Sequence, residues 1–283
     1  MQASEVSRAV AAAMSIASAL GLTVEDAIVL NDSNRLVLRL MPCDVVARVA
    51  PMAYQASGQQ LEVEVARRLA ESDSPVAALD PRVEPRVYVR DGFVIDMWTY
   101  YEHVPPRELA PADYAHALER LHAGMRKLDV KTPHFMDRVA ETQQDVASRD
   151  VTPELPDADR ELLANTLRSL RRSIVGRGAA EQLLHGEPHP WNVLSTKSGP
   201  LFIDFENSTR GPVEFDLAWV PEEVSELYPD ADQELVGECR GLMLAIIAVW
   251  RWRRDDQHPS RSQRAEWLSA FRQGPPWPAV DAV

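Results

Sequence analysis

Three side chains in the second half of the chain have the types and spacing for metal-assisted chemistry. Glu187 and Asn192 stand five positions apart in the run LHGEPHPWNVL, and Asp204 follows twelve positions later in LFIDFE. Carboxylate and amide oxygens are the hard ligands that Mg²⁺ prefers, and a carboxylate can take the proton of a substrate hydroxyl. Phosphoryl transfer asks a protein mainly for positioning and charge neutralisation. These three groups therefore predict phosphoryl transfer.

The same stretch resembles a known family of enzymes. The spacing of Glu187 and Asn192 is that of the acid and the amide in the kinase catalytic loop. The run is similar to the H-G-D-x-H-x-x-N and I-D-x-E motifs of the aminoglycoside phosphotransferase and choline kinase family, and residues 210–218 are similar to its G-D-P-x-x-D-L-A segment. The chain departs from this pattern at Glu187, since the family's catalytic base is an Asp.

The resemblance implies an α+β, bilobal, protein-kinase-like fold. We expect a small β-rich lobe with a leading helix over residues 1–101 and a larger, mostly helical lobe over residues 102–283. The resemblance also implies a small-molecule O-phosphotransferase that uses ATP or GTP with Mg²⁺. In such a site Glu187 acts as the catalytic base, and Asn192 and Asp204 hold the metal ion.

Two β-rich runs, residues 27–30 and 35–40, flank a polar turn and predict a hairpin. In the resembled family this hairpin covers the nucleotide phosphates, which makes Ser33 and Asn34 candidate nucleotide contacts. The turn has no glycine, so its backbone has less freedom to wrap a phosphate. The alternative is an ordinary turn.

The next predicted strand, residues 45–50, carries Arg48 among apolar neighbours. A kinase places a phosphate-binding Lys here, paired to a Glu on the following helix, and the fixed fork of an Arg suits phosphate oxygens equally well. The helix expected over residues 57–71 offers Glu62 as the partner, with Glu64 as the second choice. The alternative is a surface Arg on an edge strand.

Two further strands, residues 86–90 and 93–99, are predicted to form a hairpin because Asp91-Gly92 favours a tight turn. The run that ends this lobe resembles the kinase hinge, whose backbone pairs with adenine. Trp98 and Tyr100 are therefore candidate nucleotide contacts. The alternative places at least one of these aromatic side chains in the core.

The rest of the chain favours helices, and the periodic spacing of apolar residues predicts them over 111–128, 134–148, 157–175, 233–255 and 261–272. His122 lies on the first of these and is interpreted as a packed structural residue. By resemblance, His185 packs against the metal-binding loop and Asp216 braces the backbone of the catalytic loop. His189 either reaches a phosphate or holds the loop.

An acidic run from Pro221 to Glu234 contains no basic residue. In the resembled family, acidic residues of the C-terminal lobe receive the amines of cationic antibiotics. By this resemblance, the acidic run predicts an acceptor that carries both an amine and a hydroxyl. The candidate acceptor contacts are Glu206, Trp219, Glu222 and Glu223, with Tyr228 as an alternative aromatic contact. The run is equally compatible with an exposed acidic loop whose carboxylates lie at a helix N-terminus.

The chain of 283 residues has 30 basic and 43 acidic residues and a net charge of −13. Such a charge disfavours nucleic acid and anionic membranes as partners, and the longest apolar runs are too short to span a bilayer. The two cysteines, Cys43 and Cys239, suggest neither a metal motif nor a disulfide framework. We therefore expect a cytoplasmic monomer or homodimer that binds a small molecule.

The Glu187 substitution leaves more than one function open. An extra methylene moves the carboxylate by roughly 1 Å, and a shift of that size can slow a reaction about a hundredfold. The active site is either adapted to the longer side chain, or approached differently by its substrate, or silent. An aminoglycoside-type resistance kinase is the leading hypothesis. The alternatives are a catalytically silent nucleotide-binding module and a metabolic kinase that acts on an amino alcohol or a sugar.

Overall fold

The computed structural model describes residues 3–33, 35–102 and 109–277. The chain forms two compact units, one made of Met1–Leu109 with Leu194–Asn207, the other of Ala110–Val193 with Ser208–Val283. This division differs from the single boundary after residue 101 that the sequence predicts. The mixture of a β-rich part and a larger helical part confirms the predicted α+β class.

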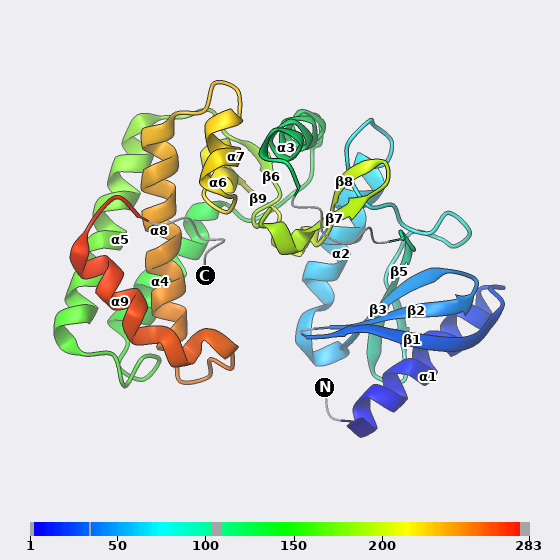
Figure 1. Cartoon of the computed structure of the whole chain (residues 1–283). Helices are drawn as coiled ribbons and strands as arrows, with labels where there is room; N and C mark the ends of the chain where they lie inside the picture. The colour runs from blue at the N-terminus through cyan, green and yellow to red at the C-terminus, as the bar shows by residue number, and fades with distance from the viewer. Residues whose placement is uncertain (1–2, 34, 103–108, 278–283) are drawn as a thin grey trace. The chain divides into compact units, whose positions relative to one another are not determined.

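The first unit contains a five-stranded antiparallel sheet with the order β1-β2-β3-β5-β4. Figure 1 labels β1, β2, β3 and β5 of this sheet. The strands are β1 (Val24–Asp32), β2 (Leu36–Pro42), β3 (Val45–Pro51), β4 (Tyr88–Arg90) and β5 (Phe93–Thr99). Asp91 and Gly92 join β4 to β5 with positive φ angles of 50° and 85°. Both angles belong to the tight hairpin turn that this dipeptide favours, so the predicted hairpin is confirmed.

One face of this sheet packs on helix α1 (Ala3–Ala19). Successive side chains of a strand point to opposite faces. Alternate residues of β2, β3 and β5 are buried in one apolar core with alanines of α1. These residues are Leu36, Leu38, Leu40, Val45, Ala47, Val49, Phe93, Ile95 and Met97, with Ala9, Ala12 and Ala13. The intervening residues of β2, β3 and β5 consequently lie on the opposite face.

That opposite face carries charged side chains. Arg48 of β3 stands directly across from Asp96 of β5 in the strand register, and helix α2 (Met52–Leu69) brings the fully buried Glu62 to the same place. Strand β3 lies in the middle of the sheet. The alternative of a surface Arg on an edge strand is therefore wrong.

A second hairpin, β7 (Val193–Thr196) and β8 (Gly199–Phe202), is followed by the short 3₁₀ helix η2 (Phe205–Asn207). The amide of Phe202 donates to the carbonyl of Pro75 at 2.8 Å, and the amide of Ala77 donates to the carbonyl of Phe202 at 3.0 Å. These hydrogen bonds attach residues 194–207 to the first unit. Sequence order alone could not show this return of the chain.

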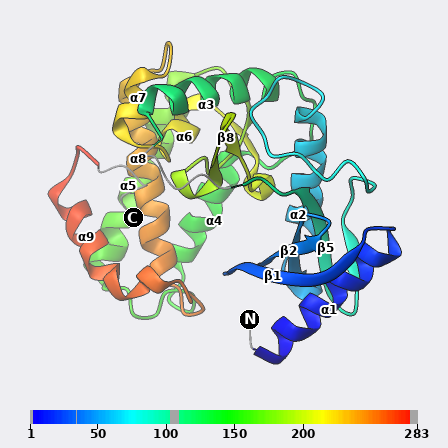
Figure 2. The same cartoon turned by 45° about the vertical axis from the view of Figure 1, so that its right-hand side comes forward.

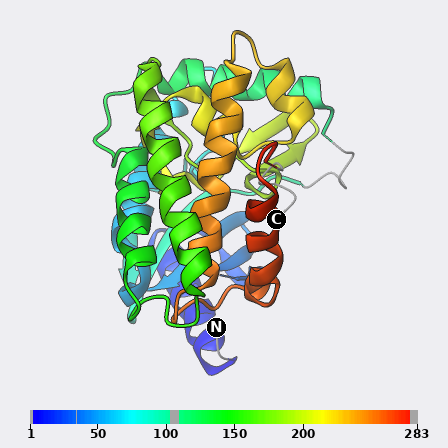
Figure 3. The same ribbon diagram turned by 90° about the vertical axis from the view of Figure 1, so that its left-hand side faces the viewer.

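The second unit is mainly helical. Helices α4 (Phe135–Ala147), α5 (Asp157–Arg177) and α8 (Gln233–Arg251) run side by side, as Figure 3 shows with α8 in orange. Their buried side chains belong to one apolar core. Helix α3 (Pro111–Met125) lies beside α7 (Glu222–Leu227) in Figure 2. The remaining elements are α6 (Val213–Leu217), α9 (Arg264–Gln273), the 3₁₀ helices η1 (Pro190–Asn192) and η3 (Pro259–Gln263), and the paired strands β6 (Gln182–Leu184) and β9 (Thr209–Gly211).

The predicted helices are present with shifts at their ends. The largest shift is at α2, which begins at Met52 instead of residue 57, and α8 stops at Arg251 instead of residue 255. Among the described residues, no helix is both long and apolar enough to cross a membrane.

Candidate active site

The loop that carries Glu187 and Asn192 leaves strand β6 through a tight bend. Leu183 and Leu184 are buried, and Gly186 follows with φ of 93°, a conformation that glycine adopts without steric cost. The carboxylate of Asp216 in α6 accepts the amides of His185 and Gly186 at 2.9 and 2.8 Å. Asp216 thus braces the loop backbone in the way that the resemblance implied.

Asp216 is itself held by a buried chain of polar groups. Its Oδ2 lies 2.9 Å from Nε2 of His122, and Nδ1 of that ring lies 2.9 Å from the hydroxyl of Tyr228. Burial raises the pKa of Tyr228, so its hydroxyl stays protonated and hydrogen-bonding at neutral pH. His122 is fully buried, and its interpretation as a packed structural residue is confirmed.

The carboxylate of Glu187 has a partner that the sequence did not indicate. Nη1 of Arg138 in α4 donates to Oε1 of Glu187 at 3.0 Å, and both side chains are less than one-fifth exposed, at 18% and 19%. The guanidinium also lies 5.7 Å from the ring centroid of Trp250. Arg138 precedes Glu187 by 49 positions, and no local pattern links the two.

Asn192 is fixed by its amide nitrogen. Nδ2 donates to the carbonyl of Glu187 at 2.9 Å and lies 3.3 Å from Nε2 of His189. Because both of these described contacts use nitrogen, the amide oxygen is the atom suited to a metal ion. Burial lowers the pKa of His189. The neutral ring can accept the Asn192 amide, which favours the role of holding the loop among the two that the sequence left open.

In the first unit, Arg48 and Glu62 form the ion pair that was expected from the sequence. Nη2 of Arg48 lies 2.6 Å from Oε2 of Glu62, and Nε donates to Oδ1 of Asp96 at 2.8 Å. Burial alone would lower the pKa of Arg48, but the carboxylates of Asp96 and Glu62 raise it above the ordinary value. Conversely, burial opposes the charge of Glu62, yet Arg48 and Arg35 hold its pKa below the ordinary value. Both groups are therefore charged at neutral pH.

Asp204 also belongs to the first unit, just before η2. Its φ is 68°, an uncommon backbone conformation for a residue with a side chain, and strained backbone of this kind gathers at functional sites. Its side chain is 36% exposed, and the next amide, that of Phe205, donates to Oε1 of Glu62 at 3.2 Å. The charged pair of Glu62 and Arg48 is thus tied directly to the Asp204 segment.

The oxygen chemistry of Asp204 and Asn192 fits a hard divalent cation such as Mg²⁺. Within the part of the chain that is described, no three His, Cys, Asp or Glu side chains are grouped so that they alone could hold a metal ion. A nucleotide-bound metal typically takes only one or two protein carboxylates plus phosphate oxygens, and each of these two side chains, taken by itself, offers an oxygen ligand of that kind.

The remaining candidates for nucleotide contact are spread over the first unit. Ser33 Oγ accepts from Nδ2 of Asn31 at 3.3 Å, and Asn34 lies outside the described residues. Trp98 is 5% exposed and carries the Arg48 guanidinium 4.5 Å from its ring centroid. Tyr100 stacks in the same way with Arg39, at 3.8 Å. Trp98 is thus a core residue that supports Arg48, as the alternative for the aromatic side chains stated.

The proposed acceptor residues do not form one surface in either unit. Trp219 is 6% exposed and packs 5.9 Å from the ring of His189, measured between centroids. Glu222 and Glu223 are exposed on α7, whereas Glu206 belongs to the first unit and contacts Arg35. Trp219 therefore acts mainly as packing for the catalytic loop in this structure.

The acidic run before α8 is partly structural. Asp232 caps α8 by accepting the amides of Glu234 and Leu235 at 3.0 and 3.1 Å. Arg177 of α5 pairs with Asp232, Glu234 and Glu238 at 3.0–3.1 Å. The carboxylates at the helix N-terminus thus match the alternative reading of this run, and they have a basic partner that is remote in sequence.

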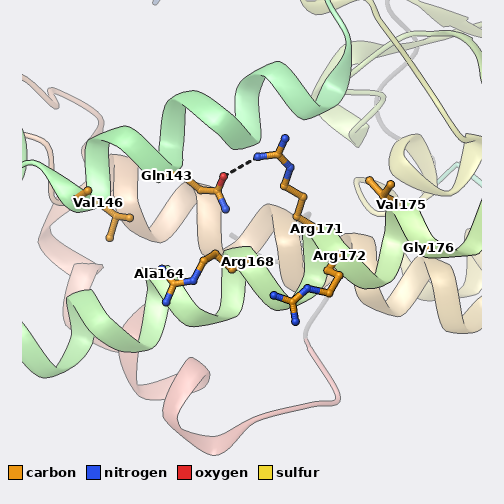
Figure 4. Close-up of a pocket in the computed structure, with 9 residues that line it drawn as sticks. Gln143, Val146, Ala164, Arg168, Arg171, Arg172, Val175 and Gly176 are labelled. Atoms are coloured by element: carbon orange, nitrogen blue, oxygen red, sulfur yellow. Dashed lines mark hydrogen bonds between the residues drawn. The ribbon is translucent and has the colours of Figure 1, made fainter.

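Two surface features complete this unit. Trp191, between the loop residues His189 and Asn192, is 88% exposed. A cavity of about 800 Å³ lies between α4 and α5. Figure 4 shows that it is lined by Arg168, Arg171 and Arg172 with Gln143 and small apolar residues. None of the site residues predicted from the sequence lines this cavity.

A family model described as the phosphotransferase enzyme family matches residues 26–254. The chain belongs to this family. The match covers both the Arg48–Glu62 region and the Glu187–Asp204 motifs, so the resemblance drawn from those motifs is confirmed. No curated protein matches the chain in sequence.

Solved structures of several small-molecule kinases have a fold similar to that of this chain. An amicoumacin kinase in complex with AMP-PNP, Ca²⁺ and Ami has a TM-score of 0.70 at 12% identity, with 99% of each chain covered. A choline/ethanolamine kinase family protein from Mesorhizobium loti has a TM-score of 0.69 at 17% identity, covering 96% of this chain and 94% of the other. A microcompartment-associated aminopropanol kinase has a TM-score of 0.68 at 15% identity, covering 87% and 90%. These likenesses confirm the predicted protein-kinase-like fold.

Proposed function

We propose that this phosphotransferase moves the γ-phosphoryl group of ATP or GTP, with Mg²⁺, to a hydroxyl of a small amine-bearing molecule. The observation that carries the proposal is the buried Arg48–Glu62 pair on a central strand and its helix. Burying two charges is costly, and the pair holds the Arg48 guanidinium in a fixed position on the central strand. A guanidinium held in this way can bind phosphate oxygens.

The contacts of Arg48 leave room for that role. Its described partners, Asp96 and Glu62, are reached through Nε and Nη2, so Nη1 is not used within the described part of the chain. The complex of amicoumacin kinase with AMP-PNP and Ca²⁺ supports a nucleotide and a divalent cation as cofactors. The nucleotide base and the identity of the cation in this chain are part of the proposal.

The remaining roles follow from the loop. A bound divalent cation would neutralise charge on the phosphates, with Asn192 and Asp204 as its protein ligands. Glu187 would accept the proton of the acceptor hydroxyl while a new bond forms between that oxygen and phosphorus. The bond from phosphorus to the β–γ bridging oxygen breaks, and the nucleoside diphosphate leaves. Arg138 would fix the direction of the Glu187 carboxylate.

An amine on the acceptor is supported by three observations. The chain has a net charge of −13, which attracts cations. Trp191 presents an exposed aromatic face two positions after His189, and such a face attracts ammonium groups. Aminopropanol kinase and choline/ethanolamine kinase are among the proteins with the same fold. Membership of an enzyme family does not favour the catalytically silent alternative.

The test is a panel of acceptors with ATP or GTP and Mg²⁺, read by the mass of the product. The panel contains aminoglycosides, other cationic antibiotics, amino alcohols, amine-bearing sugars and the deaminated counterpart of each. Product formed only with amine-bearing acceptors supports the proposal, and protection of growing cells separates an antibiotic kinase from a metabolic one. Phosphorylation of the neutral counterparts at equal kcat/KM would contradict the proposed acceptor class.

A further inference from the structure

Arg35, the residue immediately before strand β2, is a buried cation that none of the roles above uses. It is only 7% exposed. Its Nη1 lies 2.9 Å from Oε2 of Glu62, and its Nη2 lies 3.7 Å from Oδ1 of Asp204 and contacts Glu206. One guanidinium therefore faces three carboxylates.

The strand register explains how Arg35 reaches this place. Leu36 of β2 is fully buried in the core with α1, so the residue before it points to the opposite face, where Glu62 lies. On α2, the position of Gly58 lies close to Glu206. An added Cβ there would stand 3.4 Å from the Glu206 Cβ. The small residue lets the segment after Asp204 come close to the helix and to Arg35.

The charges of this cluster are out of balance. Two guanidinium groups, Arg35 and Arg48, stand against four carboxylates, those of Glu62, Asp96, Asp204 and Glu206, which gives a formal charge of 2 − 4 = −2. Arg48 and Arg35 share Glu62, and beyond it Arg48 pairs with Asp96, while Arg35 faces Asp204 and Glu206. Among the described contacts, Nη2 of Arg35 faces both the partly exposed Asp204 and the largely buried Glu206.

We propose that Arg35 is the internal counter-ion of Asp204 and Glu206, and that a divalent cation must displace it from them to bind. This inference rests on the proposed function, in which Asp204 is a metal ligand. A guanidinium and a divalent cation at the same carboxylates repel each other, so each weakens the binding of the other. Because Nη1 holds Glu62 and Nη2 faces Asp204 and Glu206, Arg35 can release the second pair and stay anchored by the first.

The test measures Mn²⁺ binding to the full chain without nucleotide, by electron paramagnetic resonance of the free ion. The proteins are the wild type, Arg35→Gln, Asp204→Asn and the control Arg86→Gln. Arg86 is an exposed Arg of the same unit whose carboxylate partner is Glu84, so both Arg variants change the net charge equally. We expect Arg35→Gln to bind Mn²⁺ about tenfold more tightly than the wild type, Arg86→Gln to bind as the wild type does, and Asp204→Asn to lose binding.

The possible outcomes separate the two proposals. Binding that Asp204→Asn abolishes and Arg35→Gln leaves unchanged overturns the counter-ion role alone. Absence of binding to the wild type and to both Arg variants contradicts the metal role of Asp204, and the inference fails with it. If Arg86→Gln also bound Mn²⁺ more tightly than the wild type, the change in net charge would explain the gain in affinity, and the inference would be overturned.

A second measurement uses only the wild type and therefore does not depend on how Arg35→Gln folds. Phenylglyoxal modifies accessible guanidinium groups, and mass spectrometry of peptides reports the rate at each Arg. We expect Mn²⁺ to raise the rate at Arg35 several-fold and to leave the rate at Arg86 unchanged. An unchanged rate at Arg35 with Mn²⁺ bound would overturn the displacement.

Discussion

Nη1 of Arg138 lies 3.0 Å from Oε1 of Glu187, so the acid that stands where the family has an Asp is held in an ion pair by a neighbouring helix. An Asp at this position would be shorter by one methylene. We propose that the loop is adapted to the longer side chain, which is one of the possibilities that the sequence left open, because the pair depends on the reach of Glu187.

Glu187→Asp should lower turnover instead of restoring it. The shorter carboxylate would lose Arg138 and retreat from the acceptor by roughly 1 Å, and a misplacement of that size costs about a hundredfold in rate. Steady-state kcat with the best acceptor of the panel measures the effect. A kcat equal to or above that of the wild type would show that the Arg138 pair is not an adaptation for catalysis.

Arg138→Gln should reduce kcat and leave the KM for nucleotide unchanged. Arg138 contacts Glu187, the proposed catalytic base, whereas the proposed phosphate contact Arg48 belongs to the other unit. The double variant Glu187→Asp with Arg138→Gln should be little worse than either single variant, since both changes break the same contact. If the loss of kcat in the double variant equalled the product of the two single losses, the two residues would act independently.

Arg48→Met should destabilise the first unit. The change leaves Glu62 and Asp96 buried with one partner fewer, and breaking a buried ion pair costs about 3–5 kcal/mol. Arg67→Met is the matched control, because Arg67 pairs with Glu64 on the solvent side of α2, where the expected cost is below about 1 kcal/mol. Urea unfolding gives the free energy of unfolding of both variants. Equal losses of this free energy would contradict the role of Arg48 as the partner of two buried carboxylates.

The sequence was sufficient for the features that depend on local pattern. The alternation of β2 and β3, the Asp91-Gly92 turn and the periodic helices all follow from side-chain spacing. Asn192 and Asp204 can be proposed as metal ligands from the sequence because their types and separation are informative in themselves. Even the Arg48–Glu62 pair followed from one strand, one helix and the resemblance.

The remaining features depend on contacts between remote segments. Strands β6 and β9 have three residues each, too few for a periodic signal. Arg138 reaches Glu187, Arg177 reaches the acidic run, and Arg35 reaches Asp204 only after the chain has folded. Each is a single Arg among 30 basic residues, and its neighbours in the sequence do not indicate which carboxylate it will contact.

Stability should fall as the pH is lowered below 6.5, partly through His189. Burial lowers the pKa of this ring from its ordinary value of 6.5, so the unfolded chain takes up the proton before the folded chain does. The contribution of neutral His189 is thus complete above pH 6.5 and is lost as the pH falls toward its folded pKa. His189→Asn should show a smaller drop in Tm between pH 7.5 and pH 5.5 than the wild type, and an equal drop would contradict the burial effect.

A second loss of stability should occur below pH 4.5. The pKa of Glu62 is held below its ordinary value of 4.5 despite its burial, because Arg48 and Arg35 favour the carboxylate. Its contribution is present above pH 4.5 and disappears as the pH falls through the folded value. Glu62→Gln should be less stable at neutral pH and lose less on acidification. A parallel pH dependence of the two proteins would exclude Glu62 as the source.

The most direct test of phosphoryl transfer compares the wild type with Asp204→Ala and with Asp113→Ala, a control that removes an exposed carboxylate from α3. The measurement is the mass of phosphorylated acceptor formed from ATP and Mg²⁺ in a fixed time. We expect product from the wild type and from Asp113→Ala, and at least a hundredfold less from Asp204→Ala, because the proposed metal ligand is lost. Equal product from Asp204→Ala would contradict the assignment of this carboxylate to the phosphoryl-transfer site.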